Sequence, residues 1–302
     1  MKVLVTGSSG LIGSALVDFL RASGHEVIRL VRSRPSPGEG KLFWDPETTT
    51  LDPTPLEGLD AVVNLAGESI VGRWTERKKT RILDSRVRST SLLSGVIAQL
   101  TKPPRVLVSA SASGYYGDRG DRPLREEDSS GSMFLSEVCR QWEAATEPAA
   151  RVGVRVVLLR FGVVLSAAGG ALARMLTPFK MGLGGRIGNG RQYWSWIAMD
   201  DVLGVVLHVL NTEVLRGPVN VGAPNPVTNL EFTKTLGRVL SRPTIFPMPA
   251  FAARLVFGEM AQELLLVSAR MEPARLLATS FKFRNPDLEA ALRRLLAKGA
   301  PA

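Results

Sequence analysis

The sequence predicts an α/β fold, with a doubly wound parallel sheet and a smaller, mostly helical lobe towards the C-terminus. Three observations lead to this prediction. Strand-like and helix-like patterns alternate through the first two-thirds of the chain, which is typical of a parallel sheet covered by helices on both faces. The first strand runs into a glycine-rich turn and an amphipathic helix. Beyond Val221 the alternation ends, and proline-rich loops and helical patterns follow.

Five segments have the composition of buried strands. They are Lys2–Thr6, Glu26–Val31, Ala61–Leu65, Arg105–Ser109 and Val154–Leu159. Helical patterns lie between most of them. The segment from Pro35 to Pro55 is rich in Pro, Gly, Asp and Thr, so we expect a long irregular excursion there.

The composition is that of an ordinary globular protein, with 302 residues, 45% of them hydrophobic and 22% charged. The chain has no apolar run of the ~18 residues that a membrane span needs, and no leader-like segment opens it. Its one cysteine, Cys139, excludes an internal disulfide and a cysteine cluster, and two histidines make a metal site unexpected. We therefore expect a cytoplasmic, metal-free protein that does not engage a membrane.

The net charge of +10 could indicate nucleic-acid binding, but the basic residues are spread along the chain. The densest cluster, from Arg73 to Arg88, is diluted by Glu76 and Asp84, and no zinc-finger, RRM or basic-zipper pattern accompanies it. A solvated helix face explains such a cluster better. We expect no nucleic-acid partner, and an anionic cofactor and an anionic substrate would account for part of the excess charge.

The most informative segment follows the first strand. Gly7, Gly10 and Gly13 stand at the spacing G-x-x-G-x-x-G. The first glycine permits a tight turn, the second lets the backbone approach a pyrophosphate, and the third lets the helix pack closely on the strand. The N-terminus of the following helix offers unpaired N–H groups and the positive end of its dipole. The segment therefore predicts a dinucleotide site.

We predict two domains around this site. Residues 1–222 would form the NADP-binding domain, interrupted at about 167–191 by a loop of the substrate lobe, and residues 223–302 would form a cap on the substrate side.

The end of the second strand indicates which dinucleotide binds. Sites that prefer NAD usually place Asp or Glu there to hold the ribose hydroxyls. This strand instead ends near Arg32 and Arg34, with no carboxylate. A guanidinium can form a forked contact with a 2′-phosphate, which a carboxylate would repel. We therefore expect NADP(H) as the cofactor, bound through Arg32 or Arg34.

Four further segments follow in a recognisable order. They are Asn64–Gly67 (NLAG), Ser109–Gly117 (SASASGYYG), Leu159–Leu165 (LRFGVVL) and Trp196–Val202 (WIAMDDV). Together with the glycine turn, they resemble the extended short-chain dehydrogenase/reductases of the NAD-dependent epimerase/dehydratase type, with a Rossmann-like fold. Phe134–Glu143 and Pro178–Ile197 resemble its atypical "epimerase family" branch, in which a short helical domain follows, as Arg270–Leu292 does here.

The resemblance assigns roles to particular residues. It implies that the cofactor contacts Gly7, Ser8, Ser9, Gly10, Leu11, Ile12, Gly13, Arg32, Arg34, Asn64, Leu65, Ala66, Gly67 and Arg160. It also implies that Ser111 polarises a substrate carbonyl, although Ser113 competes for this role because one extra residue precedes Tyr116 and Gly117.

The usual acid/base pair of this superfamily is missing. Its Tyr-x-x-x-Lys places both side chains on one helix face, so that the ammonium lowers the pKa of the phenol. Here the helix offers only Phe134 with Val138, or Leu135 with Cys139. A replacement would come from Tyr115, Tyr116, Glu137 or Cys139, of which we favour Tyr116. Alternatively, the reaction needs only hydride transfer and Ser111, or the protein binds NADP(H) without turnover. A tyrosine without a lysine neighbour stays protonated at neutral pH, which favours reduction by NADPH.

The substrate side gives a weaker signal. Arg174, Lys180, Arg186 and Arg191 surround the glycine-rich stretch Gly182–Gly190, and Trp194 and Trp196 follow it. Such residues suit a small anionic, partly planar substrate, or equally an ordinary surface loop. The sequence thus predicts an NADP(H)-binding oxidoreductase or epimerase-like enzyme. The alternative is a catalytically silent NADP(H)-binding regulatory or scaffold protein.

Overall fold

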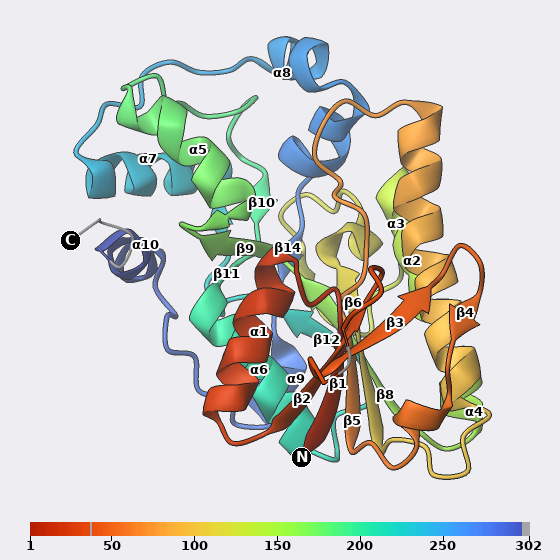
Figure 1. Cartoon of the computed structure of the whole chain (residues 1–302). Coiled ribbons are helices and arrows are strands. Elements are labelled where there is room, and N and C mark those ends of the chain that lie inside the picture. Colours follow the sequence, from red (N-terminus) through yellow and green to blue (C-terminus); the bar gives the residue numbers. More distant parts are fainter. Residues whose placement is uncertain (37, 298–302) are drawn as a thin grey trace.

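The computed structural model describes residues 1–36 and 38–297, and it contains a central sheet of eight strands (Figure 1). In spatial order the strands are β12 (Gly217–Val221), β8 (Arg155–Phe161), β6 (Val106–Ala112), β5 (Ala61–Asn64), β1 (Lys2–Thr6), β2 (Glu26–Val31), β3 (Lys41–Asp45) and β4 (Thr50–Leu51). All neighbours pair in parallel except β3 and β4. The sheet reverses direction of growth at β1, which confirms the predicted doubly wound α/β fold.

Helices cover both faces of this sheet (Figure 1). Side chains alternate along a strand, so Val3 and Val5 pack into one apolar core with helices α1 (Leu11–Ala22) and α6 (Met199–Asn211). Leu4 packs into the other core, with α2 (Glu76–Ile97) and α4 (Glu147–Arg151). Helix α3 (Phe134–Ala144) lies beside α2 on this second side.

The prediction for Pro35–Pro55 is wrong. This stretch is not a wholly irregular excursion, because β3 continues the parallel sheet beyond β2 and β4 returns antiparallel to it. Trp44 explains the difference, since its buried side chain joins the core formed by Leu56 and Leu59. The alternation of polar and apolar residues around it is too short to stand out among the turn residues.

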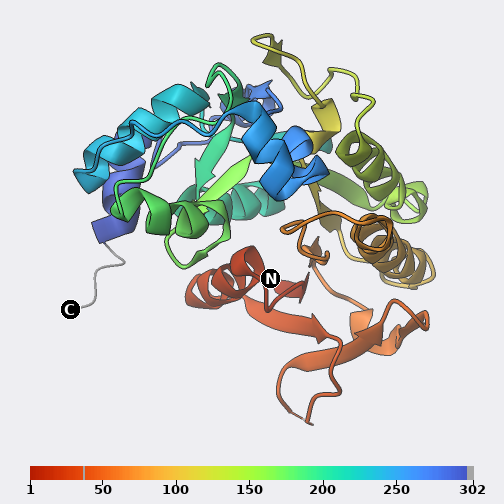
Figure 2. The same ribbon diagram turned by 90° about the horizontal axis from the view of Figure 1, so that it is seen from above.

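The remaining segments form a lobe beyond the carboxyl ends of the strands, and Figure 2 shows its helices α5 and α7 together on the side away from β3 and β4. Its elements are β7 (Pro123–Leu124), β9 (Val163–Ser166), α5 (Gly170–Lys180), β10 (Tyr193–Trp194), β11 (Trp196–Ala198), β13 (Val227–Thr228), α7 (Asn229–Leu240), α8 (Ala250–Phe257), β14 (Arg270–Met271) and α10 (Leu288–Ala297). Helix α9 (Ala274–Ala278) instead packs into the sheet core through Leu276. Strand β14 pairs with β7, so the C-terminal segment returns to the sheet domain.

The close packing of the Gly7–Gly13 turn predicts that substitution of Gly13 destabilises the protein. A methyl group on Gly13 would lie 2.2 Å from the Gly7 carbonyl oxygen, and helix α1 would have to move away from β1. We expect Gly13→Ala to lower the free energy of unfolding by about 1–3 kcal/mol, as overpacking does. Urea unfolding followed by circular dichroism measures the loss. Gly95→Ala in α2 is the control, because nothing lies within 4 Å of that position, and equal stability of the two variants would contradict the prediction.

Candidate functional site

The glycine turn connects β1 to α1 at the carboxyl edge of the sheet. Gly7 has a positive φ of 62°, and a methyl group there would lie 2.5 Å from the Leu65 carbonyl oxygen. Gly10 differs from it, because its φ is −77° and the Gly7 carbonyl oxygen, at 3.3 Å, is the one atom within 4 Å of a methyl group. Ser9 and Gly10 are exposed, whereas Ser8 and Gly13 are buried. The turn therefore presents backbone at Ser9 and Gly10, just before the free N–H groups of α1.

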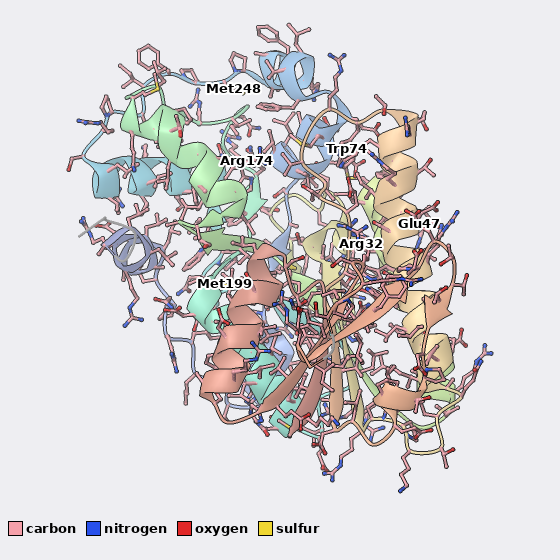
Figure 3. The ribbon with its side chains drawn as sticks, viewed as in Figure 1. Arg32, Glu47, Trp74, Arg174, Met199 and Met248 are labelled. Atoms are coloured by element: carbon pink, nitrogen blue, oxygen red, sulfur yellow. The ribbon has the colours of Figure 1, made fainter. Side chains whose placement is uncertain are left out.

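Arginines line the neighbouring end of β2. Arg29 donates from Nε to Ser8 Oγ (3.1 Å) and from Nη2 to the Ser8 carbonyl (3.2 Å), and thus ties β2 to the turn. Arg32 and Arg34 are exposed, and the guanidinium of Arg34 lies 5.6 Å from the centre of the Phe43 ring. Figure 3 labels Arg32 near the upper edge of the sheet. Positive charge therefore gathers beside the turn, where an adenosine phosphate could bind.

The NLAG segment contributes backbone to this edge and keeps Asn64 in the core. The Asn64 side chain is fully buried, accepts from Thr6 Oγ1 (2.7 Å), and donates to Thr90 Oγ1 (2.9 Å) and Ser109 Oγ (3.1 Å). These partners occupy its polar atoms, so a direct cofactor contact through this side chain is not available. Leu65 and Ala66 are half-buried and Gly67 is exposed at the strand end.

Ser111, at the end of β6, belongs to a buried ionic network. Its Oγ donates to Glu143 Oε1 over 2.6 Å. Arg160 on β8 donates to both oxygens of the same carboxylate, from Nε and Nη2, each over 2.9 Å. Because the Ser111 hydroxyl donates its hydrogen bond to Glu143, it would have to rotate before it could donate to a substrate carbonyl. In its present orientation, its oxygen can accept a hydrogen bond. Ser113 lies outside this network.

Arg160 is a core residue, which corrects the expectation that its side chain contacts the cofactor. The residue is 2% exposed, and its Nη1 donates to Tyr116 Oη (3.0 Å) and to the Glu126 carbonyl (3.1 Å). Burial by itself would lower the pKa of the guanidinium, but its hydrogen bonds to Glu143 and the charge of that carboxylate outweigh burial and raise it. Arg160 therefore stays charged and paired inside the protein.

The preference for Tyr116 as the proton donor is also wrong. Tyr116 is fully buried, and its hydroxyl donates to Asn220 Oδ1 (2.7 Å) in addition to receiving the bond from Arg160. Burial raises the pKa of this phenol to about 12. Tyr115 is half-buried, and the Arg160 guanidinium lies 3.4 Å from its ring centre. Of the two tyrosines, only Tyr115 keeps its hydroxyl out of the hydrogen-bond networks of the described residues.

The other two replacement candidates do not fit either. Glu137 forms a half-exposed ion pair with Arg140 and lies at the surface of α3. Cys139 is buried, with Sγ 3.8 Å from the Ala112 carbonyl, and burial followed by the charge of Glu143 raises the pKa of its thiol to about 11. The residue that sequence reasoning missed is Glu143. Its spacing of four from Cys139 places both on the helix face towards β6, and that spacing could have revealed it.

The two tryptophans that follow the glycine-rich stretch are part of the core. Trp194 and Trp196 lie in the core of the second lobe, and Trp196 Nε1 donates to the Asn225 carbonyl (3.1 Å). This corrects the expectation that their rings face a planar ligand. Arg174 and Arg191 are exposed, and Figure 3 labels Arg174 on α5. That these basic residues bind an anionic substrate therefore stays a prediction.

Within residues 1–36 and 38–297, no group of three His, Cys, Asp or Glu side chains is placed to hold a metal ion. In the same ranges, no helix is both long enough and apolar enough to cross a membrane.

Comparison with known proteins agrees with this geometry. Residues 3–222 match the family model described as "NAD dependent epimerase/dehydratase family". The chain belongs to this family. Residues 248–295 match a domain of unknown function, DUF1731, and the resemblance seen in the sequence is thereby confirmed.

Several relatives match over nearly the whole chain. An epimerase family protein of Mycobacterium bovis is 46% identical over 96% of both chains. The human epimerase family protein SDR39U1, whose crystal structure contains NADPH, superposes with a TM-score of 0.91 at 38% identity, covering 98% of this chain and 99% of that one. A UDP-N-acetylglucosamine 4-epimerase from Bacillus cereus has a TM-score of 0.77, with 99% of both chains covered, but at 19% identity it shares the fold alone.

The buried ion pair makes a prediction about stability. Glu143→Gln leaves the Arg160 charge inside the protein without its counter-charge, and we expect a loss of about 3 kcal/mol in the free energy of unfolding. Urea denaturation measures the loss. Glu137→Gln on the same helix is the matched control, since its ion pair is half-exposed and should contribute less than about 1 kcal/mol. Equal losses of unfolding free energy in the two variants would contradict the prediction that the buried ion pair of Glu143 stabilises the fold more than the half-exposed pair of Glu137.

The raised pKa of Cys139 predicts low thiol reactivity in the folded protein and a loss of stability at high pH. With a thiol pKa of about 11, the thiolate fraction at pH 8 is about one in a thousand, and burial also blocks access. We expect native protein at pH 8 to leave Ellman's reagent unreacted over minutes and to release one equivalent of chromophore in guanidinium chloride. Because folding raises this pKa from its ordinary 9.0, the thiol contributes stability that is lost as pH rises from about 9 through 11. Fast reaction of the native protein would contradict this assignment.

Proposed function

We propose that this chain binds NADP(H) at the Gly7–Gly13 turn and acts on a small substrate as an oxidoreductase or epimerase-like enzyme. The observation that carries the proposal is Gly10. Its φ is ordinary and the Gly7 carbonyl oxygen, at 3.3 Å, is the one atom close to an added methyl group, so folding gives a weaker reason for glycine here than at Gly7 or Gly13. A diphosphate lying against the turn gives that reason, since it would meet any larger side chain.

The preference for NADP(H) rests on charge. Arg32 and Arg34 are exposed after β2, with no carboxylate at the strand end, and a 2′-phosphate there would meet guanidinium groups. The NADPH found in the crystal structure of human SDR39U1, at 38% identity, supports the same choice.

The bound cofactor would supply or accept hydride, and the protein must then handle a proton. Ser111 is 2% exposed, so a substrate hydroxyl would have to reach its Oγ from the end of β6. Oγ would then accept a hydrogen bond from that hydroxyl, and its own proton could pass to Glu143 Oε1 over 2.6 Å. The reverse transfer would deliver a proton to an oxygen that is being reduced. Arg160 fixes the Glu143 carboxylate through two hydrogen bonds and so keeps it aligned with Ser111.

A catalytically silent NADP(H)-binding protein is the second candidate function. The burial of Tyr116 favours it, because the hydroxyl expected to deliver a proton is committed to Asn220 and Arg160. Transfer of deuterium from 4-deuterated NADPH to any recovered product would decide for the enzyme.

The arginines beside β2 make a prediction about cofactor choice. We expect wild-type protein to bind NADPH more tightly than NADH, and Arg32→Ala to lose about 1.5–3 kcal/mol of NADPH affinity, or roughly ten- to a hundredfold. NADH affinity should change little, because NADH has no 2′-phosphate. Isothermal titration calorimetry measures all four constants.

Two further variants make this experiment decisive. Gly10→Val should lose both cofactors while its circular dichroism spectrum and melting temperature stay near those of wild type. Arg21→Ala, on α1 and exposed, should bind both normally. Equal wild-type affinities for NADPH and NADH would overturn the NADP preference, and normal binding by a folded Gly10→Val would place the site elsewhere.

A further inference from the structure

Arg86, at the carboxyl edge of the sheet, forms no ion pair with any of the described residues. Arg86 lies on α2, and its Nη1 donates to the Ile82 carbonyl on the same helix over 2.9 Å. Its guanidinium lies 5.1 Å from the centre of the Trp142 ring. Arginine has five N–H donors, so most of those of Arg86 are unused by the protein.

The position of Arg86 follows from its neighbour one helical turn further on. Thr90 Oγ1 accepts from Asn64 Nδ2 (2.9 Å) and from Trp142 Nε1 (3.0 Å), which fixes that turn of α2 against the end of β5. Residues four apart share a helix face, and α2 runs back down from the carboxyl edge, so Arg86 lies about 6 Å further out along the helix than Thr90. It therefore stands just beyond the end of β5.

Contact with Gly67 confirms that position. A methyl group built on Gly67 would lie 3.2 Å from Arg86 Cζ and 3.4 Å from Nη2. The guanidinium thus rests on the backbone that follows β5, and a larger residue at position 67 would displace it. Burial lowers the pKa of Arg86, as expected for a partly desolvated cation. The charge of Glu68 gives it little compensation, because that carboxylate is paired with Lys78 over 2.8 Å.

The strand order indicates which half of a bound dinucleotide would lie near Arg86. Ligands of open α/β sheets cross the carboxyl edge at the switch point, here between β1 and β5. If the adenosine end of the cofactor lies towards β2 and Arg32, the other half extends over β5 and β6. Arg86 and Ser111 stand on that half. In this orientation Arg86 lies on the β5 side of the switch point, on the half of the edge where a substrate would react.

We propose that Arg86 is an anion-binding residue on the nicotinamide half of the site, where its free guanidinium edge takes a phosphate or carboxylate group. The inference rests on the proposed NADP(H) site. A planar fork resting on Gly67 and Trp142 suits bidentate recognition of such a group. Two sources can provide the anion, namely the cofactor diphosphate or an acidic group of the substrate. Without such an anion, the described residues leave this partly buried cation without an ion-pair partner, which is costly.

The experiment compares Arg86→Met with Arg77→Met, which removes an exposed arginine from the same helix. NADPH is titrated into each protein by calorimetry, and inorganic phosphate is then titrated into the NADPH-saturated proteins. A loss of NADPH affinity of about tenfold or more, confined to Arg86→Met, assigns the anion to the cofactor. Unchanged NADPH affinity with loss of phosphate binding, again confined to Arg86→Met, assigns it to the substrate. No difference from Arg77→Met in either titration overturns the proposal.

Two controls separate the possible failures. If wild-type protein does not bind NADPH, the proposed cofactor site fails, and phosphate titration of the free proteins then tests Arg86 by itself. If Arg86→Met does not fold, Arg86→Lys replaces it, because lysine keeps the charge and loses the fork. We expect Arg86→Lys to bind the anion several-fold more weakly, and wild-type affinity in that variant would overturn the forked contact.

Discussion

The pairing of Glu143 with Arg160 is the constraint on which the rest of the site depends. A carboxylate and a guanidinium are both almost buried here, with side-chain exposures of 11% and 3%. Such charges are tolerated only when their hydrogen-bonding groups are satisfied. Ser111 donates a further hydrogen bond to the carboxylate, and the guanidinium donates its remaining hydrogen bonds to Tyr116 Oη and the Glu126 carbonyl. The pair therefore fixes α3, β6 and β8 at one point and decides how each neighbouring polar group is used.

This constraint explains how the site can lack the usual tyrosine and lysine and still be built to a fixed geometry. The helix that normally carries them contributes Glu143 instead, and its carboxylate is directed at Ser111. Cys139, one turn earlier, is a buried thiol. Positive charge enters the site from other elements, through Arg160 in the core and through Arg86 at the end of β5. The chemistry of the site is thus carried by ionic groups that lie on three different elements.

The two halves of the carboxyl edge are consequently built in different ways. Beside β1 and β2, the protein offers exposed backbone at Ser9 and Gly10 and exposed arginines, an arrangement suited to phosphate groups. Beside β5 and β6, it offers the hydrogen-bonded network of Ser111, Glu143 and Arg160, together with the guanidinium of Arg86, which is unpaired among the described residues. Distant structures such as the Bacillus cereus epimerase share the fold at 19% identity, but fold does not determine chemistry. The specific function of this chain must therefore be sought in the second half.

The sequence by itself determined the parallel sheet, the glycine turn and the charge beside β2, because each depends on residues that are close along the chain. Strands β1 and β2 have the predicted bounds, and the three glycines act within seven residues. Tertiary structure alone decided that Tyr116 and Arg160 are buried and which groups Glu143 contacts. Tyr116 meets Asn220 from 104 residues away, and Ser111 meets Glu143 from 32 residues away. Whether a polar side chain faces a ligand or the core depends on such distant partners, and no local pattern records them.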